Sequence, residues 1–115
     1  MRFSVFGQPV SKLRRVIGPS EVLVLAASPT LLVDLTDVGN ANAVVSIFNN
    51  HASASIFYCF HTSGSGAPSL TTANGTPLFA QGSMIIDSCG GIAIWAIAAA
   101  DQVSGAGTRV TGTKI

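Results

Sequence analysis

β-branched side chains dominate this chain and constrain its fold more than any other feature. Val, Ile and Thr supply 29 of its 115 residues, whereas the helix formers Glu and Lys occur once and twice. β-branched side chains lose rotamer freedom in a helix and pack well on a pleated sheet. Turn residues also punctuate the chain at short intervals, as in all-β sandwiches and barrels. The composition therefore predicts an all-β fold, and the length allows one domain with a core of its own.

Alternation of apolar and polar residues, bounded by turn residues, predicts about eight strands. In Ile92–Ala98 the alternation and the preceding Gly90-Gly91 favour a strand over the competing helix. Ala43–Asn49 and Ser53–His61 predict a hairpin around the polar residues between them. We expect a single antiparallel β-sandwich or jelly-roll-like barrel. Its predicted strands are Glu21–Ala27, Thr30–Val38, Ala43–Asn49, Ser53–His61, Ser69–Thr72, Met84–Ser88, Ile92–Ala98 and Thr108–Thr113.

Charge is unevenly placed along the chain. The first 15 residues contain four of the six basic residues and no acid, whereas the remaining 100 carry two basic residues and five acids. We therefore predict a basic N-terminal arm over residues 1–18 and a β-sandwich domain over residues 19–115. Apolar anchors and basic groups of such an arm suit an acidic partner surface, and a disordered tail is the alternative. The predicted partner-binding residues are Arg2, Phe3, Phe6, Lys12, Arg14 and Arg15.

The middle of the chain lacks the charged residues that a solvent-exposed surface normally carries. No Asp, Glu, Lys or Arg occurs from Val38 to Ile86, and several predicted strands, such as Ile92–Ala98, are apolar on both faces. A sandwich on its own keeps one face of each sheet wet. Its own loops, the arm or a neighbouring subunit would have to cover the second apolar face. We favour a neighbouring subunit, and hence a homo-oligomer or a larger assembly.

Composition argues against several other classes of protein. A net charge of +1 does not favour nucleic acid as the main partner. The longest apolar run, Ile92–Ala100, is far shorter than a membrane helix, and polar residues interrupt the first 15 positions, so neither a membrane span nor a secretory signal is expected. Without a secretory signal, the sequon at Asn74 is interpreted as a turn.

No catalytic or cofactor motif is present, so we expect a protein that is not an enzyme and binds no cofactor or metal. The predicted hairpin would keep His51 and His61 too far apart to share a metal. Cys59 and Cys89 are expected to be buried free thiols, with a bridge between neighbouring strands as the alternative. Tyr58 and Trp95 are candidates for a sugar-stacking platform, but the apolar surroundings of Trp95 favour core packing.

The second half of the chain has a recognisable order of short motifs. They are Asn74-Gly75-Thr76-Pro77-Leu78, Gly82-Ser83-Met84-Ile85-Ile86, Gly91-Ile92-Ala93-Ile94-Trp95-Ala96-Ile97-Ala98 and Gly107-Thr108-Arg109-Val110. This order resembles small β-sandwich virion proteins of tailed bacteriophages, over about residues 70 to 112. The resemblance implies a structural role without catalysis, on the capsid or in the neck, tail or fibre.

The resemblance and the residue-level reading together predict a capsid decoration or cement protein. It would assemble in the host cytoplasm, bind across subunits of the major capsid protein, or other virion proteins, and stabilise the shell through many sites. The basic arm would hold the shell and the sandwich would form the oligomer. A neck, tail or fibre component is the first alternative, and a receptor- or carbohydrate-binding module is the second.

Overall fold

The computed structural model describes residues 15–35, 42–89 and 91–114, and this part of the chain is all strand and loop. No helix in these ranges is long and apolar enough to cross a membrane. The eight strands are β1 (Arg15–Val22), β2 (Thr30–Asp34), β3 (Asn42–Asn49), β4 (Ile56–Thr62), β5 (Thr76–Leu78), β6 (Ser83–Cys89), β7 (Ile92–Ala98) and β8 (Thr108–Lys114).

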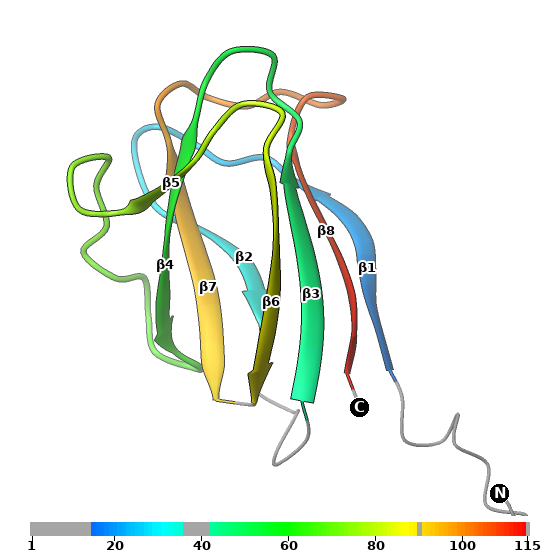
Figure 1. Cartoon of the computed structure of the whole chain (residues 1–115). Helices are drawn as coiled ribbons and strands as arrows, with labels where there is room; N and C mark the ends of the chain where they lie inside the picture. The colour runs from blue at the N-terminus through cyan, green and yellow to red at the C-terminus, as the bar shows by residue number, and fades with distance from the viewer. Residues whose placement is uncertain (1–14, 36–41, 90, 115) are drawn as a thin grey trace, which may run out of the picture.

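The strands form two four-stranded antiparallel sheets that pack face to face (Figure 1). One sheet has the order β1-β8-β3-β6 and the other has the order β2-β7-β4-β5. Strand β1 therefore pairs with β8, β2 with β7, β3 with β6 and β4 with β5. This nested pairing is a long antiparallel hairpin rolled up on itself, which is the jelly-roll arrangement. The predicted all-β sandwich is confirmed.

The core lies between the sheets and takes one side of each strand. In β3 the buried residues Ala43, Val45 and Ile47 alternate with more exposed ones, and Ile94, Ala96 and Ala98 of β7 face them from the other sheet. Ile92–Ala98 is a strand with the predicted bounds, because its alternation places these residues in the core.

The chain enters the fold earlier than predicted. Strand β1 starts at Arg15, so the predicted boundary after residue 18 falls inside it, and residues 23–27 of the predicted strand Glu21–Ala27 form a loop. The register of β1 with β8 shifts between Ile17 and Ser20, which makes Gly18-Pro19 a bulge in an edge strand. An edge strand tolerates proline at a bulge because the N–H that proline lacks is not needed for pairing at that position.

The predicted hairpin of Ala43–Asn49 with Ser53–His61 is wrong. Strand β3 pairs with β6 and β8, whereas β4 lies in the other sheet and pairs with β5 and β7. The connection over residues 50–55 therefore crosses from one sheet to the other. With β1–β2, β5–β6 and β7–β8 it gathers at one end of the sandwich, which we call the loop end (residues 23–29, 50–55, 79–82 and 99–107; Figure 1).

The predicted strand Ser69–Thr72 is also wrong, because this segment is a turn. The Asn74 side chain accepts a hydrogen bond from Thr71 N (2.8 Å) and donates one to the Ser69 carbonyl oxygen (3.0 Å). These bonds use the Asn74 amide to close the turn, in agreement with the interpretation of the sequon. The short strand β5 follows it. In β2 the observed strand ends at Asp34, and residues 36–38 of the predicted Thr30–Val38 lie outside the described ranges.

Candidate interaction surfaces

The structure describes little of the predicted arm. Arg2, Phe3, Phe6, Lys12 and Arg14 lie outside the described residues. Arg15 starts β1, where its backbone pairs with that of Lys114 at the end of β8. Residues 15–18 of the predicted arm thus belong to β1.

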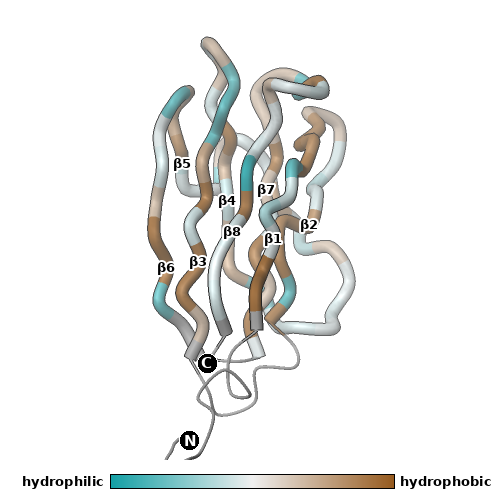
Figure 2. Tube along the Cα trace, turned by 90° about the vertical axis from the view of Figure 1, so that its right-hand side faces the viewer, coloured by the Kyte–Doolittle hydropathy of each residue, from teal (hydrophilic) through white to brown (hydrophobic). Residues whose placement is uncertain are grey.

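The outer face of the β1-β8-β3-β6 sheet is a broad exposed surface, which we call the open face. Figure 2 looks onto it, with β6 at one edge and β1 at the other. Val16 is 75 % exposed, Val44 39 % and Ile85 74 %. Cross-strand neighbours of these apolar residues are mainly hydroxyl side chains, such as Ser46 beside Ile85 and Thr113 beside both valines.

Few charges interrupt the open face within the described residues, and one of them is already engaged. The Glu21 carboxylate accepts hydrogen bonds from Gly105 N (2.9 Å) and Gly107 N (3.0 Å) in the β7–β8 connection. The bond from Gly107, then that from Gly105, and to a lesser extent the positive charge of Arg109 lower the pKa of Glu21 below its ordinary value. Glu21 thus acts as a clamp on a neighbouring loop, and Asp87 and Arg109 are the remaining described charges of the face.

The outer face of the other sheet is covered in part by the chain itself, although Leu31, which pairs with Trp95, is 38 % exposed. Ile97 of β7 points away from the core, because its neighbours Ala96 and Ala98 point into it, yet Ile97 is only 7 % exposed. Leu70 in the β4–β5 connection is 5 % exposed, and Leu70 and Phe57 both lie against Gly75. A Cβ at Gly75 would meet the Leu70 Cδ1 at 2.9 Å and the Phe57 Cβ at 2.8 Å, so only glycine fits there. A loop of the chain, rather than a neighbouring subunit, covers this part of the face.

Tyr58 and Trp95 do not form the aromatic platform considered from the sequence. Tyr58 packs against the core, whereas Trp95 is paired with Cys59 and stands on the opposite side of the same sheet. Trp95 is half-buried on that outer side, and its indole Nε1 is buried with no hydrogen-bond partner among the described residues. An aromatic surface for sugar stacking needs both rings on one exposed face, and these two residues do not supply it.

The loop end is held together by a buried polar network that the sequence analysis missed. Asn49 and Thr108 are fully buried and Gln102 is 4 % exposed. The Gln102 Oε1 accepts hydrogen bonds from Val24 N (3.1 Å) and Thr108 Oγ1 (3.0 Å), and its Nε2 donates one to the Asn49 Oδ1 (3.0 Å).

Asn49 extends the network to the remaining connections. Its Nδ2 donates to the carbonyl oxygens of Ala54 (3.0 Å) and Leu78 (3.0 Å), and its Oδ1 accepts from His51 N (3.1 Å). Residues of all four loop-end connections, or of the strand ends beside them, are thereby tied to two buried amides. A signal was present in the sequence, because Asn49 continues the core-facing series Ala43, Val45, Ile47. The network makes the loop end a rigid support.

The polar residues considered for chemistry do not converge. His51 lies at the loop end, where its Nδ1 accepts hydrogen bonds from Ser53 N (3.1 Å) and Ala54 N (2.8 Å). His61 lies near the far end of β4 beside a shallow hollow that Phe60, Thr62, Gly91 and Ile92 complete. Burial raises the pKa of the Cys59 thiol, which is a free cysteine. No group of three or more His, Cys, Asp or Glu among the described residues is placed to hold a metal ion.

Comparisons of the chain with models of protein families, with curated proteins and with solved structures found no match. Over the described residues the protein is thus a jelly-roll β-sandwich with an open, charge-poor sheet face.

Proposed function

We propose that this protein is a structural component of a virion, a capsid decoration or cement protein that binds across subunits of the shell and stabilises it. In this proposal the basic segment at the N-terminus contacts the shell, and the sandwich assembles with further copies. The protein would act through its surfaces and would catalyse no reaction.

The open face is the observation that carries the proposal. A sheet face that stays in water normally bears Lys, Glu and Arg, which keep it from associating. Here the exposed apolar residues Val16, Val44 and Ile85 stand mainly among Ser and Thr side chains. A charge-poor face with exposed apolar groups is typical of a surface that another protein covers.

The strand order and the rigid loop end support the same proposal. Jelly rolls build many viral capsid domains, although lectin domains share the fold, so the strand order narrows the function without deciding it. The network of Asn49, Gln102 and Thr108 fixes the loops to one another. Fixed loops suit a part that repeats over a shell, because each copy then presents the same shape at low entropic cost.

Co-sedimentation with shells that lack the protein tests this proposal. The wild-type chain should bind to saturation at a fixed ratio to the major capsid protein, and added salt should weaken binding because charges of the arm are screened. Deletion of residues 1–14 should abolish binding and leave the fold intact, since β1 begins at Arg15. Removal of Arg15 as well would cost β1 its first pair with β8.

A pair of charge-matched variants separates the arm from net charge. Lys12→Gln with Arg14→Gln should weaken binding by about tenfold at low salt, from two lost contacts of about 0.5–1 kcal/mol each. Val103→Glu with Ser104→Glu changes the net charge equally at exposed positions of the loop end and should have little effect. Equal losses in both variants would refute a specific role of the arm. Failure of the wild-type chain to bind shells would refute decoration, and binding to isolated tails instead would assign it there.

A further inference from the structure

The four edge strands of the sandwich differ in how well they are protected against pairing with another strand. Strand β1 carries the bulge at Gly18-Pro19, β2 has a register shift between Leu31 and Val33, and β5 is three residues long and contains Pro77. Bulges, prolines and short lengths are the usual means by which proteins keep sheet edges from associating.

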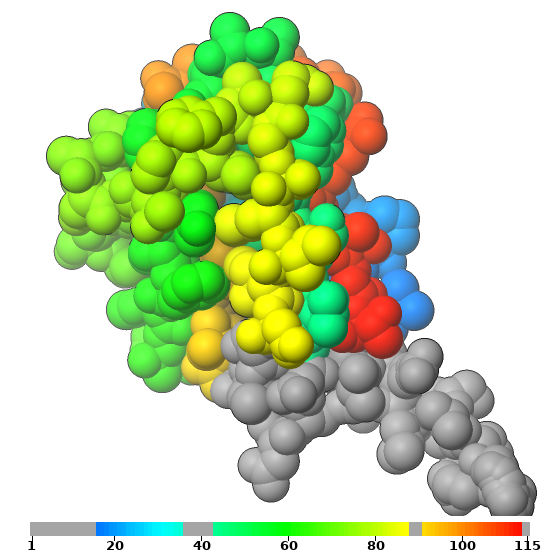
Figure 3. All heavy atoms as spheres, viewed as in Figure 1, coloured from blue at the N-terminus to red at the C-terminus, as the bar shows by residue number. Residues whose placement is uncertain are grey.

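Strand β6 has none of these features. It pairs with β3 in an unbroken register over seven residues, from Phe48↔Ser83 to Asn42↔Cys89. No described strand pairs with its other side, and Figures 2 and 3 show it at the margin of the sheet and on the surface. Its sequence contains no proline or lysine, and its single charge is Asp87.

The hydrogen bonds at the end of β3 show which groups of β6 are free. Asn49 N donates to the Gly82 carbonyl oxygen (2.9 Å), whereas Asn50 N donates to the Gly107 carbonyl oxygen on the other side (3.1 Å). Residues of β3 thus face β6 and β8 in alternation, and the β3 residues that face β6 are paired with Met84 and Ile86. The N–H and C=O groups of Ser83, Ile85 and Asp87 therefore point away from β3, to the free edge.

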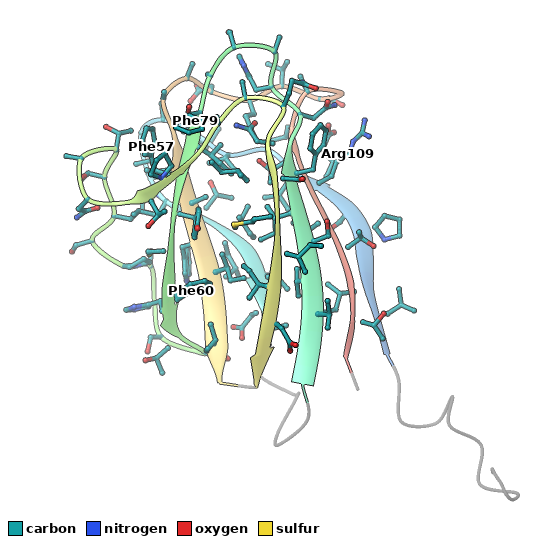
Figure 4. All side chains as sticks on the ribbon, viewed as in Figure 1. Phe57, Phe60, Phe79 and Arg109 are labelled. Carbon is teal, nitrogen blue, oxygen red and sulfur yellow. The ribbon has the colours of Figure 1, made fainter. Side chains whose placement is uncertain are left out.

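Apolar side chains border this edge. Ile85 is 74 % exposed on the open face, and Met84 and Ile86 are partly buried against the core. Strand β5 pairs with β4 only as far as Tyr58, and no strand in the described ranges pairs with the rest of that edge of β4. Phe60 lies there and is 53 % exposed, below β5 in Figure 4.

We propose that β6 pairs with β6 of a second copy of this chain, antiparallel and centred on Ile85, so that two sandwiches share one eight-stranded sheet. A twofold axis at Ile85 places Ile85 against its counterpart and Ser83 opposite Asp87 of the partner. The outward N–H and C=O groups of these three residues would form roughly six hydrogen bonds across the axis.

The chemistry of the strand favours this register over its neighbours. A twofold axis at Asp87 would place two carboxylates opposite each other, which is destabilising. A twofold axis at Ile86 would place the Asp87 carboxylate against Ile85, which offers it no hydrogen-bond donor. With the axis at Ile85, the Asp87 carboxylate of each copy faces the Ser83 hydroxyl of the other. The two copies of Ile85, the most exposed apolar side chain of the edge, then cover each other. Because the strand fits itself in this way, a second copy is the occupant to expect.

Sedimentation velocity of the full chain, from about 1 to about 100 μM, tests the pairing. The wild-type chain should associate with rising concentration. Ile85→Lys should raise the dissociation constant of this step by at least about tenfold, because two ammonium groups would then stand opposite each other. Val103→Lys is the matched control, since Val103 is also an exposed apolar residue (62 %) but lies in the β7–β8 connection, outside the open face, and it should leave association unchanged. Thermal unfolding of each variant checks that it is folded.

Mixing variants tests the register itself. Ile85→Glu alone should also dissociate, and an equimolar mixture of Ile85→Lys with Ile85→Glu should associate again, because only a twofold axis at residue 85 places the two new charges opposite each other. A monomeric wild-type chain at all concentrations, equal effects of Val103→Lys and Ile85→Lys, or tighter association of Ile85→Lys alone would each overturn the proposal. This pairing rests on the proposed function only in one respect, namely that a decoration protein of this kind would assemble with further copies. Its test uses the purified chain without shells, so its failure is distinct from a failure to bind shells.

Discussion

The buried amide of Gln102 offers a sharp test of what stabilises the loop end. We consider Gln102→Met, which keeps the length and nearly the volume of the side chain but removes its polar atoms. The substitution deletes the bonds to Val24 N, Thr108 Oγ1 and Asn49 Oδ1. Gln102 N still donates to the Val24 carbonyl oxygen (3.0 Å), so the backbone of the connection stays in place.

The expected cost follows from the number of bonds and from their burial. Three hydrogen bonds at about 0.5–1.5 kcal/mol each give roughly 1.5–4.5 kcal/mol. The upper half of this range applies, because Val24 N and the Thr108 hydroxyl belong to residues with no exposed surface and lose their partner without gaining water. We expect the free energy of unfolding to fall by about 3 kcal/mol, and the melting temperature by about 10 °C.

Urea and thermal unfolding followed by circular dichroism measure this change. Gln81→Met is the matched control, because Gln81 also bonds across the loop end, to the His51 carbonyl oxygen (3.1 Å), but is exposed. It should cost no more than about 0.5 kcal/mol. Addition of Thr108→Val to Gln102→Met should cost about 1 kcal/mol less than the sum of the single changes, since valine removes the orphaned hydroxyl. A Gln102→Met protein within about 1 kcal/mol of wild type would refute the reasoning.

Two further predictions concern the clamp at Glu21 and the loop over the second sheet. The folded state lowers the pKa of Glu21, so the stabilising effect of the Glu21 carboxylate is present above the ordinary value of 4.5 and is lost as the pH falls through the lower folded value. The difference in melting temperature between wild type and Glu21→Gln should therefore shrink in acid. A difference that does not change with pH would contradict this. Leu70→Ala should lower the free energy of unfolding by about 2–3 kcal/mol in urea titrations, whereas the same change at the 43 % exposed Leu25 should cost much less, and equal costs would show that the loop does not pack on the sheet.

Local patterns were enough to predict where most strands lie. Ile92–Ala98 has the bounds that its alternation and preceding glycines indicate, and β3, β6 and β8 begin and end within one residue of the prediction. These strands are regular because one face of each is buried, and burial imposes a period of two on the sequence. The strand is irregular at the bulge of Gly18-Pro19. A glycine–proline pair is also a turn signal, so the sequence predicted the boundary between arm and sandwich there.

The pairing of strands was beyond the reach of local patterns. A short polar stretch between Asn49 and Ile56 fits a hairpin loop, but here Asn49 is buried and its amide holds the Ala54 and Leu78 carbonyl oxygens, which belong to a crossing between sheets. Its hydrogen-bond partners are 5 and 29 residues away, and Gln102 is 53 residues away. No window of sequence around Asn49 contains this information, although an amide in a core-facing position already indicates a buried network.

The two outer faces of the sandwich differ in how far the chain itself covers them. Apolar residues on both sides of a strand led to the expectation that a neighbouring subunit covers them. On the β2-β7-β4-β5 sheet the chain covers part of the face, because Leu70, close to Phe57, is 5 % exposed and Ile97 is 7 % exposed, whereas Leu31 is 38 % exposed. On the β1-β8-β3-β6 sheet nothing in the described residues covers Val16, Val44 or Ile85. The most exposed apolar residues of the two outer faces, Val16 and Ile85, thus lie on one sheet, and the unprotected strand β6 forms the margin of that same sheet. A partner that adds to β6 and a partner that lies on the open face would therefore meet at Ile85, whose substitution by lysine opposes both.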